Sequence, residues 1–181
     1  MTGFPARHVM TERSFLPLKI AILTVSDTRT LENDGSGQLL ENSIREAGHL
    51  PPLREIVTDN TYAIRAVLSD WIARPEVDVI ISTGGTGVTG RDGTPEAARV
   101  LFDKTLDGFG ETFRLLSYEE IGSSTIQSRA LAGVANGTYI FCLPGSSGAC
   151  RLGWENIIRH QLDYRTRPCN LVELIPRLKE Q

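Results

Sequence analysis

Cysteine is scarce in this chain, which has three in 181 residues, and no two of them stand in a CxxC motif. The three are Cys142, Cys150 and Cys169. Disulfide-stabilised domains and structural zinc sites need more cysteines at defined spacings. The sequence therefore argues against both classes, and it favours reduced thiols in a cytoplasmic protein.

Long apolar runs and an excess of basic residues are missing as well. No stretch approaches the roughly 20 apolar residues of a membrane-spanning helix, and residues 1–17 lack the apolar region of a signal peptide. The formal net charge is −3, and Lys and Arg form no run. Because binding to nucleic acid or to a membrane surface needs a basic patch, we expect neither as a partner.

The residues that are present suit one domain of ordinary size. The chain is 40% hydrophobic and 23% charged, which are typical values for a globular protein. We expect residues 1–17 to be an N-terminal extension, residues 18–165 to form a single domain, and residues 166–181 to be a C-terminal tail. Pro168 and Pro176 interrupt the tail, which predicts an extended path across the surface.

Short apolar runs predict the strands of this domain. They are rich in Ile, Val and Leu and are bounded by turn or capping residues. The four runs are Leu18–Val25, Leu53–Val57, Val77–Ser82 and Thr138–Leu143. Helical periods lie between them, so we expect an α/β fold with a mostly parallel sheet covered on both faces. Asn136-Gly137, preceded by Leu131–Ala135, predicts a local antiparallel hairpin.

Apolar residues at helical spacing predict the helices, and capping residues mark the start of the second and third of them. We expect helices after Ser36, from a cap at Asn60 or Thr61, from Thr94-Pro95, around Phe109 and Phe113, and from Cys150 to Gln161.

The segment STGGTGVTGRDGTPE, residues 82–96, is the most informative part of the sequence. It leaves a buried strand and enters a helix, the place where open α/β sheets bind ligands. The four glycines among residues 84–90 allow the backbone to approach a ligand and to turn its N–H groups toward an anion. We therefore predict a phosphate-binding loop here. The alternative is a tight strand-to-helix connection, for which one or two glycines normally suffice.

Two familiar nucleotide motifs do not account for this loop. Gly85, Gly87 and Gly90 have the spacing G-x-G-x-x-G, but residues 91–93 intervene before the helix, and the acids about 20 residues further on lie in or beside helical sequence. An NAD site is therefore not expected. No G-x-x-x-x-G-K-[ST] motif occurs, which excludes a P-loop.

A second loop, Leu143–Ala149, also joins a strand to a helix. Its hydroxyl groups stand at capping positions, so taken alone it indicates ordinary helix capping. Beside the glycine loop at the same sheet edge, it is a candidate second wall of one pocket.

Several charged residues follow the predicted strands. Asp59 and Asp92 stand at strand ends, where carboxylates beside phosphate-binding loops usually hold Mg²⁺. The alternatives are a helix cap for Asp59 and a turn for Asp92. Asp27 and Asp34 are further candidates for the rim. Ser128-Arg129 precedes the hairpin, and Arg129 could present its guanidinium to a phosphate or form a surface ion pair.

At these residues the sequence resembles the MoaB/MogA family of molybdenum-cofactor biosynthesis proteins, which includes the G domain of gephyrin. The resemblance covers residues 19–170. It is carried by five short motifs in this order: Thr24-Val25-Ser26-Asp27, Gly84-Gly85-Thr86-Gly87, Arg91-Asp92-x-Thr94-Pro95-Glu96, Ser128-Arg129-Ala130-Leu131-Ala132-Gly133 and Leu143-Pro144-Gly145-Ser146.

The resemblance implies a three-layer α/β/α fold and a reaction, the transfer of AMP from Mg-ATP to molybdopterin with release of pyrophosphate. The two carboxylates that are essential in the adenylyltransferases fall on Asp59 and Asp92, which would be catalytic and would hold Mg²⁺. The residues implied to bind molybdopterin and ATP are Ser26, Asp27, Gly84, Gly85, Thr86, Gly87, Arg91, Thr94, Ser128, Arg129, Pro144, Gly145, Ser146 and Ser147.

The resemblance also implies a homo-trimer or homo-hexamer, with other proteins of cofactor biosynthesis as possible partners. A sequence feature supports an interface, because the tail contains the apolar residues Leu171, Val172, Leu174 and Ile175.

Two positions depart from the family pattern. Family members with established activity usually have Pro-Gly-Asn-Pro where this chain has Pro144-Gly145-Ser146-Ser147, and Val where Gly93 stands. Two classes of function therefore stay open. One is a molybdopterin adenylyltransferase, which the Asp59 and Asp92 pair favours. The other is a catalytically weak, oligomeric pterin- or nucleotide-binding accessory protein, which the altered loop favours.

Overall fold

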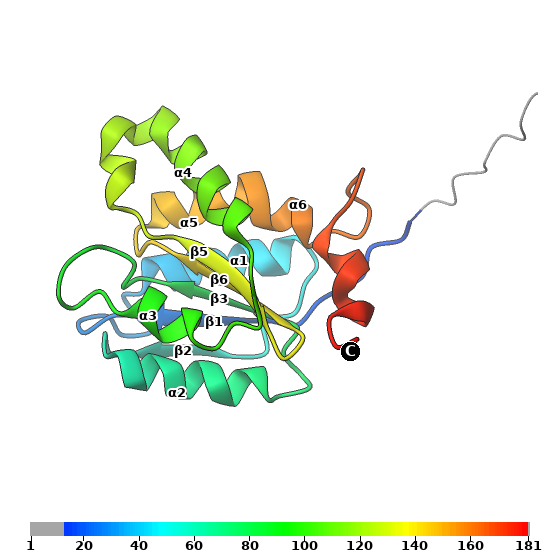
Figure 1. Ribbon diagram of the computed structural model, residues 1–181, viewed down its shortest axis with the longest axis horizontal. Coiled ribbons are helices and arrows are strands. Elements are labelled where there is room, and N and C mark those ends of the chain that lie inside the picture. Colours follow the sequence, from blue (N-terminus) through cyan, green and yellow to red (C-terminus); the bar gives the residue numbers. More distant parts are fainter. Residues whose placement is uncertain (1–12, 181) are drawn as a thin grey trace, which may run out of the picture.

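The computed structural model describes residues 13–180, and residues 1–12 of the expected N-terminal extension lie outside the described residues. A six-stranded sheet runs through the middle of the molecule (Figure 1), in the order β2-β1-β3-β6-β5-β4. The strands are β1 (Ile20–Val25), β2 (Arg54–Val57), β3 (Val79–Thr83), β4 (Lys104–Thr105), β5 (Leu131–Ala135) and β6 (Thr138–Leu143).

The pairing of the strands confirms a mostly parallel sheet with a local hairpin. β1 lies parallel to β2 and β3, and β3 lies parallel to β6. β5 is antiparallel to β6 and to β4. Asn136 and Gly137 form the hairpin turn with φ of 48° and 81°, the positive values that a type I′ turn requires. β4 was not expected, because two residues are too few to produce an alternating pattern.

Helices cover the sheet and connect its strands. They are α1 (Gly35–Glu46), α2 (Thr61–Ile72), α3 (Thr94–Arg99), α4 (Asp107–Ile121), the 3₁₀ helix η1 (Gly122–Gln127), α5 (Ser147–Gly153), the π-helical turn η2 (Trp154–Ile158), α6 (Arg159–Gln161) and the 3₁₀ helix η3 (Leu171–Arg177). The elements α5, η2 and α6 follow one another without a break, so the expected helix from Cys150 to Gln161 is present with a π turn inside it.

Side-chain capping explains where two of these helices begin. The Asn60 side chain accepts hydrogen bonds from the N–H groups of Tyr62 and Ala63 at the start of α2. Ser146 accepts from the N–H of Ala149 at the start of α5. Thr94 was expected to cap α3, but it is the first residue of that helix. Its hydroxyl instead donates to the carbonyl of Gly84 at 2.8 Å, which ties the helix to the glycine loop.

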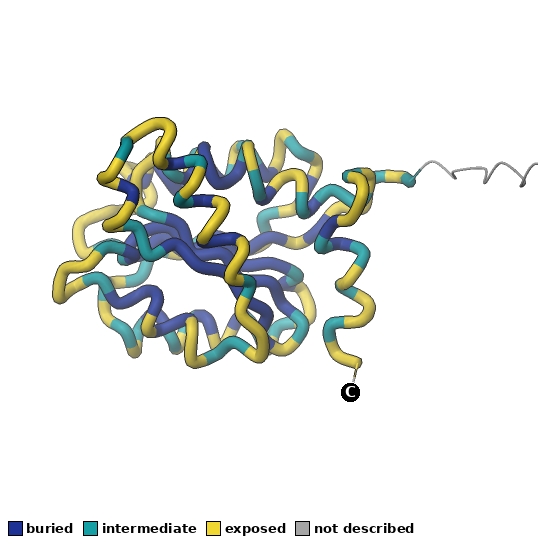
Figure 2. Tube along the Cα trace, turned by 45° about the horizontal axis from the view of Figure 1, so that its top comes forward, coloured by how far each residue is buried: buried dark blue, intermediate teal, exposed yellow. Residues whose placement is uncertain are grey.

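Alternate residues of the central strands enter two separate hydrophobic cores. Ile20 and Ile22 of β1 pack on the face covered by α1, α4 and α5. Ala21 and Leu23 pack on the opposite face, covered by α2 and α3. Figures 1 and 2 show the resulting three layers, with the buried sheet between two helical layers. This is the three-layer α/β/α arrangement that the sequence led us to expect.

The C-terminal tail corrects one expectation. An extended path is wrong for Leu171–Arg177, which forms the 3₁₀ helix η3 with Asn170 as its N-cap. Val172 is buried, Leu171 and Ile175 pack against the core, and the hydroxyl of Tyr139 donates to the carbonyl of Leu171 at 2.9 Å. The chain itself therefore covers most of the apolar residues that suggested an interface, and the oligomeric state stays a prediction.

The start of the described chain is attached to the C-terminal tail. Arg13, at the start of the described chain, forms an ion pair with Glu173 of the tail and lies over the Tyr164 ring. Among residues 13–180 no helix combines the length and the apolar character that crossing a membrane requires.

Candidate functional site

The site lies at the carboxyl ends of three neighbouring parallel strands, β1, β3 and β6. After β1 the chain proceeds to the neighbouring strand β2, whereas after β3 it leads toward the other side of the sheet. Such a reversal is where open α/β sheets leave a crevice for ligands. A cavity of about 420 Å³ occupies this position, within the size range of small-molecule sites.

Ten of the sixteen predicted site residues line this cavity. They are Ser26, Gly84, Gly85, Thr86, Gly87, Asp92, Ser128, Pro144, Gly145 and Ser146. The other six do not line it, namely Asp27, Asp59, Arg91, Thr94, Arg129 and Ser147. The glycine loop and the Pro144–Ser146 loop therefore meet as two walls of one cavity, as the sequence predicted.

Close backbone packing explains two of the glycines. Gly84 has φ of 103°, and a Cβ atom there would lie 2.2 Å from the carbonyl oxygen of Val25. Gly145 packs directly against Gly84, since a Cβ at Gly145 would be 3.3 Å from the Gly84 Cα. Gly84 therefore allows the loop after β3 to pack against the end of β1, and Gly145 allows the loop after β6 to pack closely against Gly84.

Arg129 does not line the cavity and instead holds the glycine loop from behind. Its Nε donates to the carbonyl of Gly87 at 2.6 Å, its Nη2 donates to the carbonyl of Asp92 at 2.8 Å, and its Nη1 pairs with Glu96. The backbone of the same residue donates to the carbonyl of Thr86 at 3.0 Å. Arg129 is thus a positioning residue for the loop.

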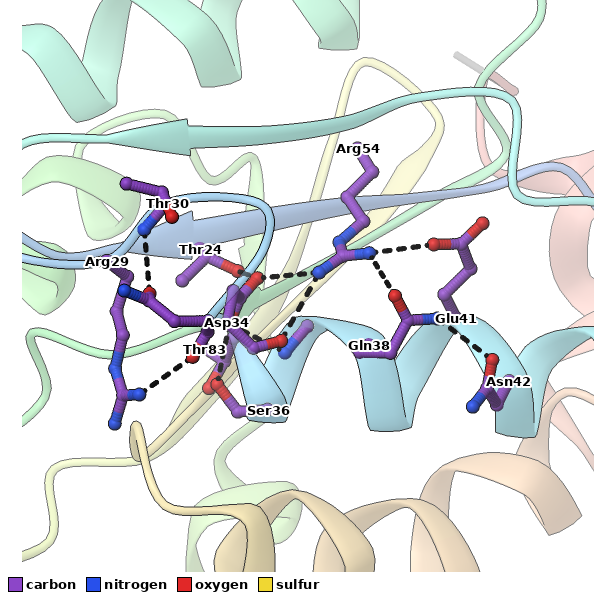
Figure 3. A network of polar contacts seen from close by, with 12 residues as sticks. Thr24, Arg29, Thr30, Asp34, Ser36, Gln38, Glu41, Asn42, Arg54 and Thr83 are labelled. Atoms are coloured by element: carbon purple, nitrogen blue, oxygen red, sulfur yellow. Dashed lines mark hydrogen bonds and ion pairs between the residues drawn. The ribbon is translucent and has the colours of Figure 1, made fainter.

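Asp34 was a candidate for the rim, and the structure corrects this. Its carboxylate is buried below the cavity and accepts hydrogen bonds from Thr24 Oγ1 at 2.7 Å and from the Gly37 N–H at 2.9 Å, and it pairs with Arg54 at 3.2 Å (Figure 3). Burial alone would raise the pKa of Asp34, but these hydrogen bonds and the Arg54 charge outweigh it and lower the pKa. Asp34 caps α1 and holds the floor of the cavity.

The two carboxylates predicted to be catalytic lie near each other beside the glycine loop. Asp59 accepts from the Gly93 N–H at 3.2 Å, and Asp92 accepts from the N–H and the hydroxyl of Thr89 at 2.8 and 2.7 Å. Asp92 lines the cavity, whereas Asp59 does not line it but lies close to Gly85, where an added Cβ would be 3.0 Å from Asp59 Oδ1. Asp27 pairs with Arg91 and accepts from the Asp59 N–H at 3.1 Å, which joins the loop after β1 to this group.

The two carboxylates differ in their protonation behaviour. Burial, followed by repulsion from Asp92 and Asp27, raises the pKa of Asp59 against the opposing effects of the Gly93 hydrogen bond and Arg91. For Asp92, the Thr89 hydroxyl is the largest influence and lowers the pKa. The carboxylate of Asp59 therefore has more negative than positive charge near it, and a bound cation would compensate this excess. Among residues 13–180 no three His, Cys, Asp or Glu side chains form a group able to hold a metal ion by themselves.

Sequence reasoning missed one wall of the cavity. Phe113, Ser117 and Ile121 of α4, with Ser124 and Gln127 of η1, also line it. The three α4 residues follow one another at i, i+4 and i+8, so they share a helix face that the helical period could have indicated. Thr24 and Thr83 were also missed, although each is a polar residue near the end of an apolar strand.

Comparisons with known proteins agree with this geometry. A family model described as "Probable molybdopterin binding domain" matches residues 21–164. The molybdenum cofactor biosynthesis protein B of Escherichia coli K12 is 60% identical over 156 residues, which are 86% of this chain and 92% of that protein.

Solved structures give the same result. A crystal structure of a molybdenum cofactor biosynthesis protein B has a TM-score of 0.84 and 40% identity, and it covers 93% of this chain and 100% of that one. The Mog protein from Mycobacterium ulcerans has a TM-score of 0.72 and 27% identity, covering 80% of this chain and 97% of its own. With the loops and the fold already described, these similarities show that the chain belongs to the MoaB/MogA family of molybdenum cofactor biosynthesis proteins.

Proposed function

We propose that this chain binds molybdopterin and Mg-ATP at the carboxyl edge of its sheet and transfers AMP to molybdopterin, releasing pyrophosphate. The observation that carries the proposal is the cavity where the glycine loop, the Pro144–Ser146 loop and Asp92 meet. Both reactants carry phosphate, and this wall offers backbone N–H groups and hydroxyls to an anion.

Each part of the cavity has a distinct role in this reaction. The backbone of Gly85–Gly87 and the hydroxyls of Ser128 and Ser146 would bind phosphate oxygens. The side chain of Phe113 provides apolar surface for a ring system on the α4 wall. Holding the two reactants side by side supplies orientation, which is a large part of the rate enhancement in phosphoryl and nucleotidyl transfer.

The residues present fit a Mg²⁺ ion that is shared with substrate. Mg²⁺ is usually held by one or two carboxylates together with substrate phosphates and water, so a complete protein cage is not needed. Asp59 and Asp92 would hold it, and the pKa of Asp59 is raised first by burial and then by the negative charges of Asp92 and Asp27. When bound, the ion would neutralise phosphate charge and allow two anionic reactants to approach.

A second function, pterin or nucleotide binding with little turnover, is supported by one feature. Ser146 and Ser147 occupy the Pro144–Ser147 loop where active relatives carry a different pair, and Ser147 does not line the cavity. An accessory protein of the same pathway would keep the binding loop without needing the carboxylates to act on ATP.

The experiment measures binding and turnover with the same preparation. Molybdopterin is titrated calorimetrically, and pyrophosphate release is followed with molybdopterin, ATP and Mg²⁺. Adenylyl transfer predicts release that stops when Mg²⁺ is chelated. Binding without release would support the accessory function, and absence of both would overturn the proposal.

A further inference from the structure

A second, larger cavity of about 830 Å³ lies at the β4 edge of the sheet. Helices α3 and α4 cover opposite faces of the sheet, and this cavity opens where both reach its edge, with residues 128–131 as its floor. We name it the arginine groove, after Arg65, Arg99, Arg114 and Arg129 in its lining. Ser128 lines both this groove and the first cavity, beside the glycine loop, which we call the catalytic cavity because the proposed transfer would take place there.

Most hydrogen-bond donors of these arginines have no protein acceptor. A guanidinium carries five N–H donors. Arg65 makes one hydrogen bond, to the carbonyl of Glu96 at 3.1 Å, and Arg114 makes one, to the carbonyl of Ala130 at 3.1 Å. Arg65 Nε is buried without any partner within residues 13–180, and the exposed side chain of Arg99 has no hydrogen bond or ion pair there. Leaving the buried Nε of Arg65 unpaired is costly, and the exposed guanidinium donors are free to bind a ligand that supplies oxygens.

The charge of the groove indicates what kind of ligand fits. Its acidic residues are Glu96 and Asp107, so four guanidinium groups against two carboxylates leave a net charge of +2. A single carboxylate would balance half of this charge. A phosphate group carries about two charges and several acceptor oxygens, which suit guanidinium donors from more than one direction.

The walls leave room for more than a free phosphate ion. Val100 and Ile126 are 64% and 82% exposed at the margin of the groove, and Leu106 adds apolar surface within it. A small organic molecule that carries a phosphate would therefore cover apolar side chains as well as charge.

From these observations we infer that the arginine groove is a second binding site, separate from the catalytic cavity, for a phosphate-bearing small molecule with at least two negative charges. Arg129 connects the two sites, because the side chain that lines the groove also holds the carbonyls of Gly87 and Asp92. A ligand in the groove would fix this guanidinium and with it the glycine loop. The inference does not depend on the proposed adenylyl transfer.

Calorimetric titration of inorganic pyrophosphate into the full chain, without molybdopterin or ATP, tests the inference. Arg99→Gln should weaken pyrophosphate binding about tenfold, because a charge-assisted hydrogen bond is lost. Arg99 is an exposed residue in the last turn of α3, so its replacement leaves the core intact. Arg99→Lys keeps the charge and should weaken binding less than Arg99→Gln.

Arg159→Gln is the matched control, since Arg159 is an exposed arginine of α6 outside both cavities. It should leave pyrophosphate affinity unchanged. If Arg99→Gln also leaves the affinity unchanged, pyrophosphate binds at the glycine loop alone and the inference is wrong. Failure of adenylyl transfer would not affect this result, because the titration contains no second substrate.

Discussion

Two groups of carboxylates follow neighbouring strands of the sheet, and they differ in how many partners the protein gives them. Asp34 is buried, and Thr24, Gly37 and Arg54 satisfy it. Asp59 accepts one hydrogen bond, from Gly93, and its pKa is raised by burial and then by the nearby charges of Asp92 and Asp27. A carboxylate whose oxygens all have hydrogen-bond or charge partners within the protein stabilises the fold. A carboxylate with few such partners is available to a ligand or a cation.

The largest effect is expected when the buried group is broken. Asp34→Ala should lower the free energy of unfolding by about 3 kcal/mol, because it removes the side-chain cap of α1 and leaves the largely buried Arg54 with Glu41 as its remaining charge partner. Denaturant unfolding measures this, with Asp70→Ala as control in an exposed pair with Arg74, where we expect a change below about 1 kcal/mol.

Acid should act on Asp34 in the same direction. The folded-state pKa of Asp34 is lowered, so the stability that its carboxylate contributes is present above the unfolded value of about 3.9 and is lost as the pH falls through the folded value.

A loss of stability in Asp34→Ala no larger than in the Asp70→Ala control would show that the two groups of carboxylates do not differ as described.

The second prediction concerns Asp59 and Asp92, the two carboxylates beside the glycine loop. Asp59→Asn and Asp92→Asn should each reduce Mg²⁺-dependent adenylyl transfer on the order of 100-fold. Their free energy of unfolding should change by less than about 1 kcal/mol, because neither side chain holds a core element. Pyrophosphate release and a melting curve of each variant measure the two effects, with Asp70→Asn as the matched exposed control.

Full transfer in both Asp→Asn variants would contradict a role for the carboxylates in holding the metal. Unfolding of both would instead assign them the structural role that Asp34 has.

The smallest effects should come from one added methyl group beside each carboxylate. A Cβ at Gly37 would lie 2.0 Å from Asp34 Oδ2, and a Cβ at Gly85 would lie 2.4 Å from Thr94 Oγ1 and 3.0 Å from Asp59 Oδ1. Gly37→Ala should cost about 2 kcal/mol of stability and reduce transfer little in the molecules that remain folded. Gly85 has φ of 64°, so Gly85→Ala should cost about 1 kcal/mol of stability. It should reduce transfer more than Gly37→Ala does.

The pair is compared by measuring melting temperature and transfer rate in the same preparations. If Gly37→Ala reduced transfer more than Gly85→Ala, the floor of the cavity rather than its rim would control the reaction.

Local sequence patterns were sufficient for five of the six strands, the hairpin and both loops. Apolar runs, capping residues and the Asn136-Gly137 turn depend on neighbours in the chain, so the sequence contains the information directly. The same holds for the meeting of the two loops at one edge, because parallel strands bring their carboxyl ends together.

Residue roles that depend on distant partners could not be predicted in this way. Asp34 and Asp27 lie on the same loop, so the sequence gives them the same expected role. Arg54 of β2 pairs with the buried Asp34, which gives Asp34 a role in holding the fold. Arg129 contacts Gly87 and Asp92, some 40 positions earlier in the chain, and these contacts make it a positioning residue for the glycine loop. The α4 wall was missed because its residues look like an ordinary amphipathic face until the tertiary packing is known.

The short edge strand β4 has a consequence for how copies of the chain can meet. It contributes two residues, Lys104 and Thr105, and both are exposed. Edge strands this short that carry lysine give an incoming strand few backbone groups to pair with, and removal of the lysine charge from water opposes close approach. We therefore expect any assembly on the β4 side to form through helices and side chains rather than by continuing the sheet from one molecule into the next.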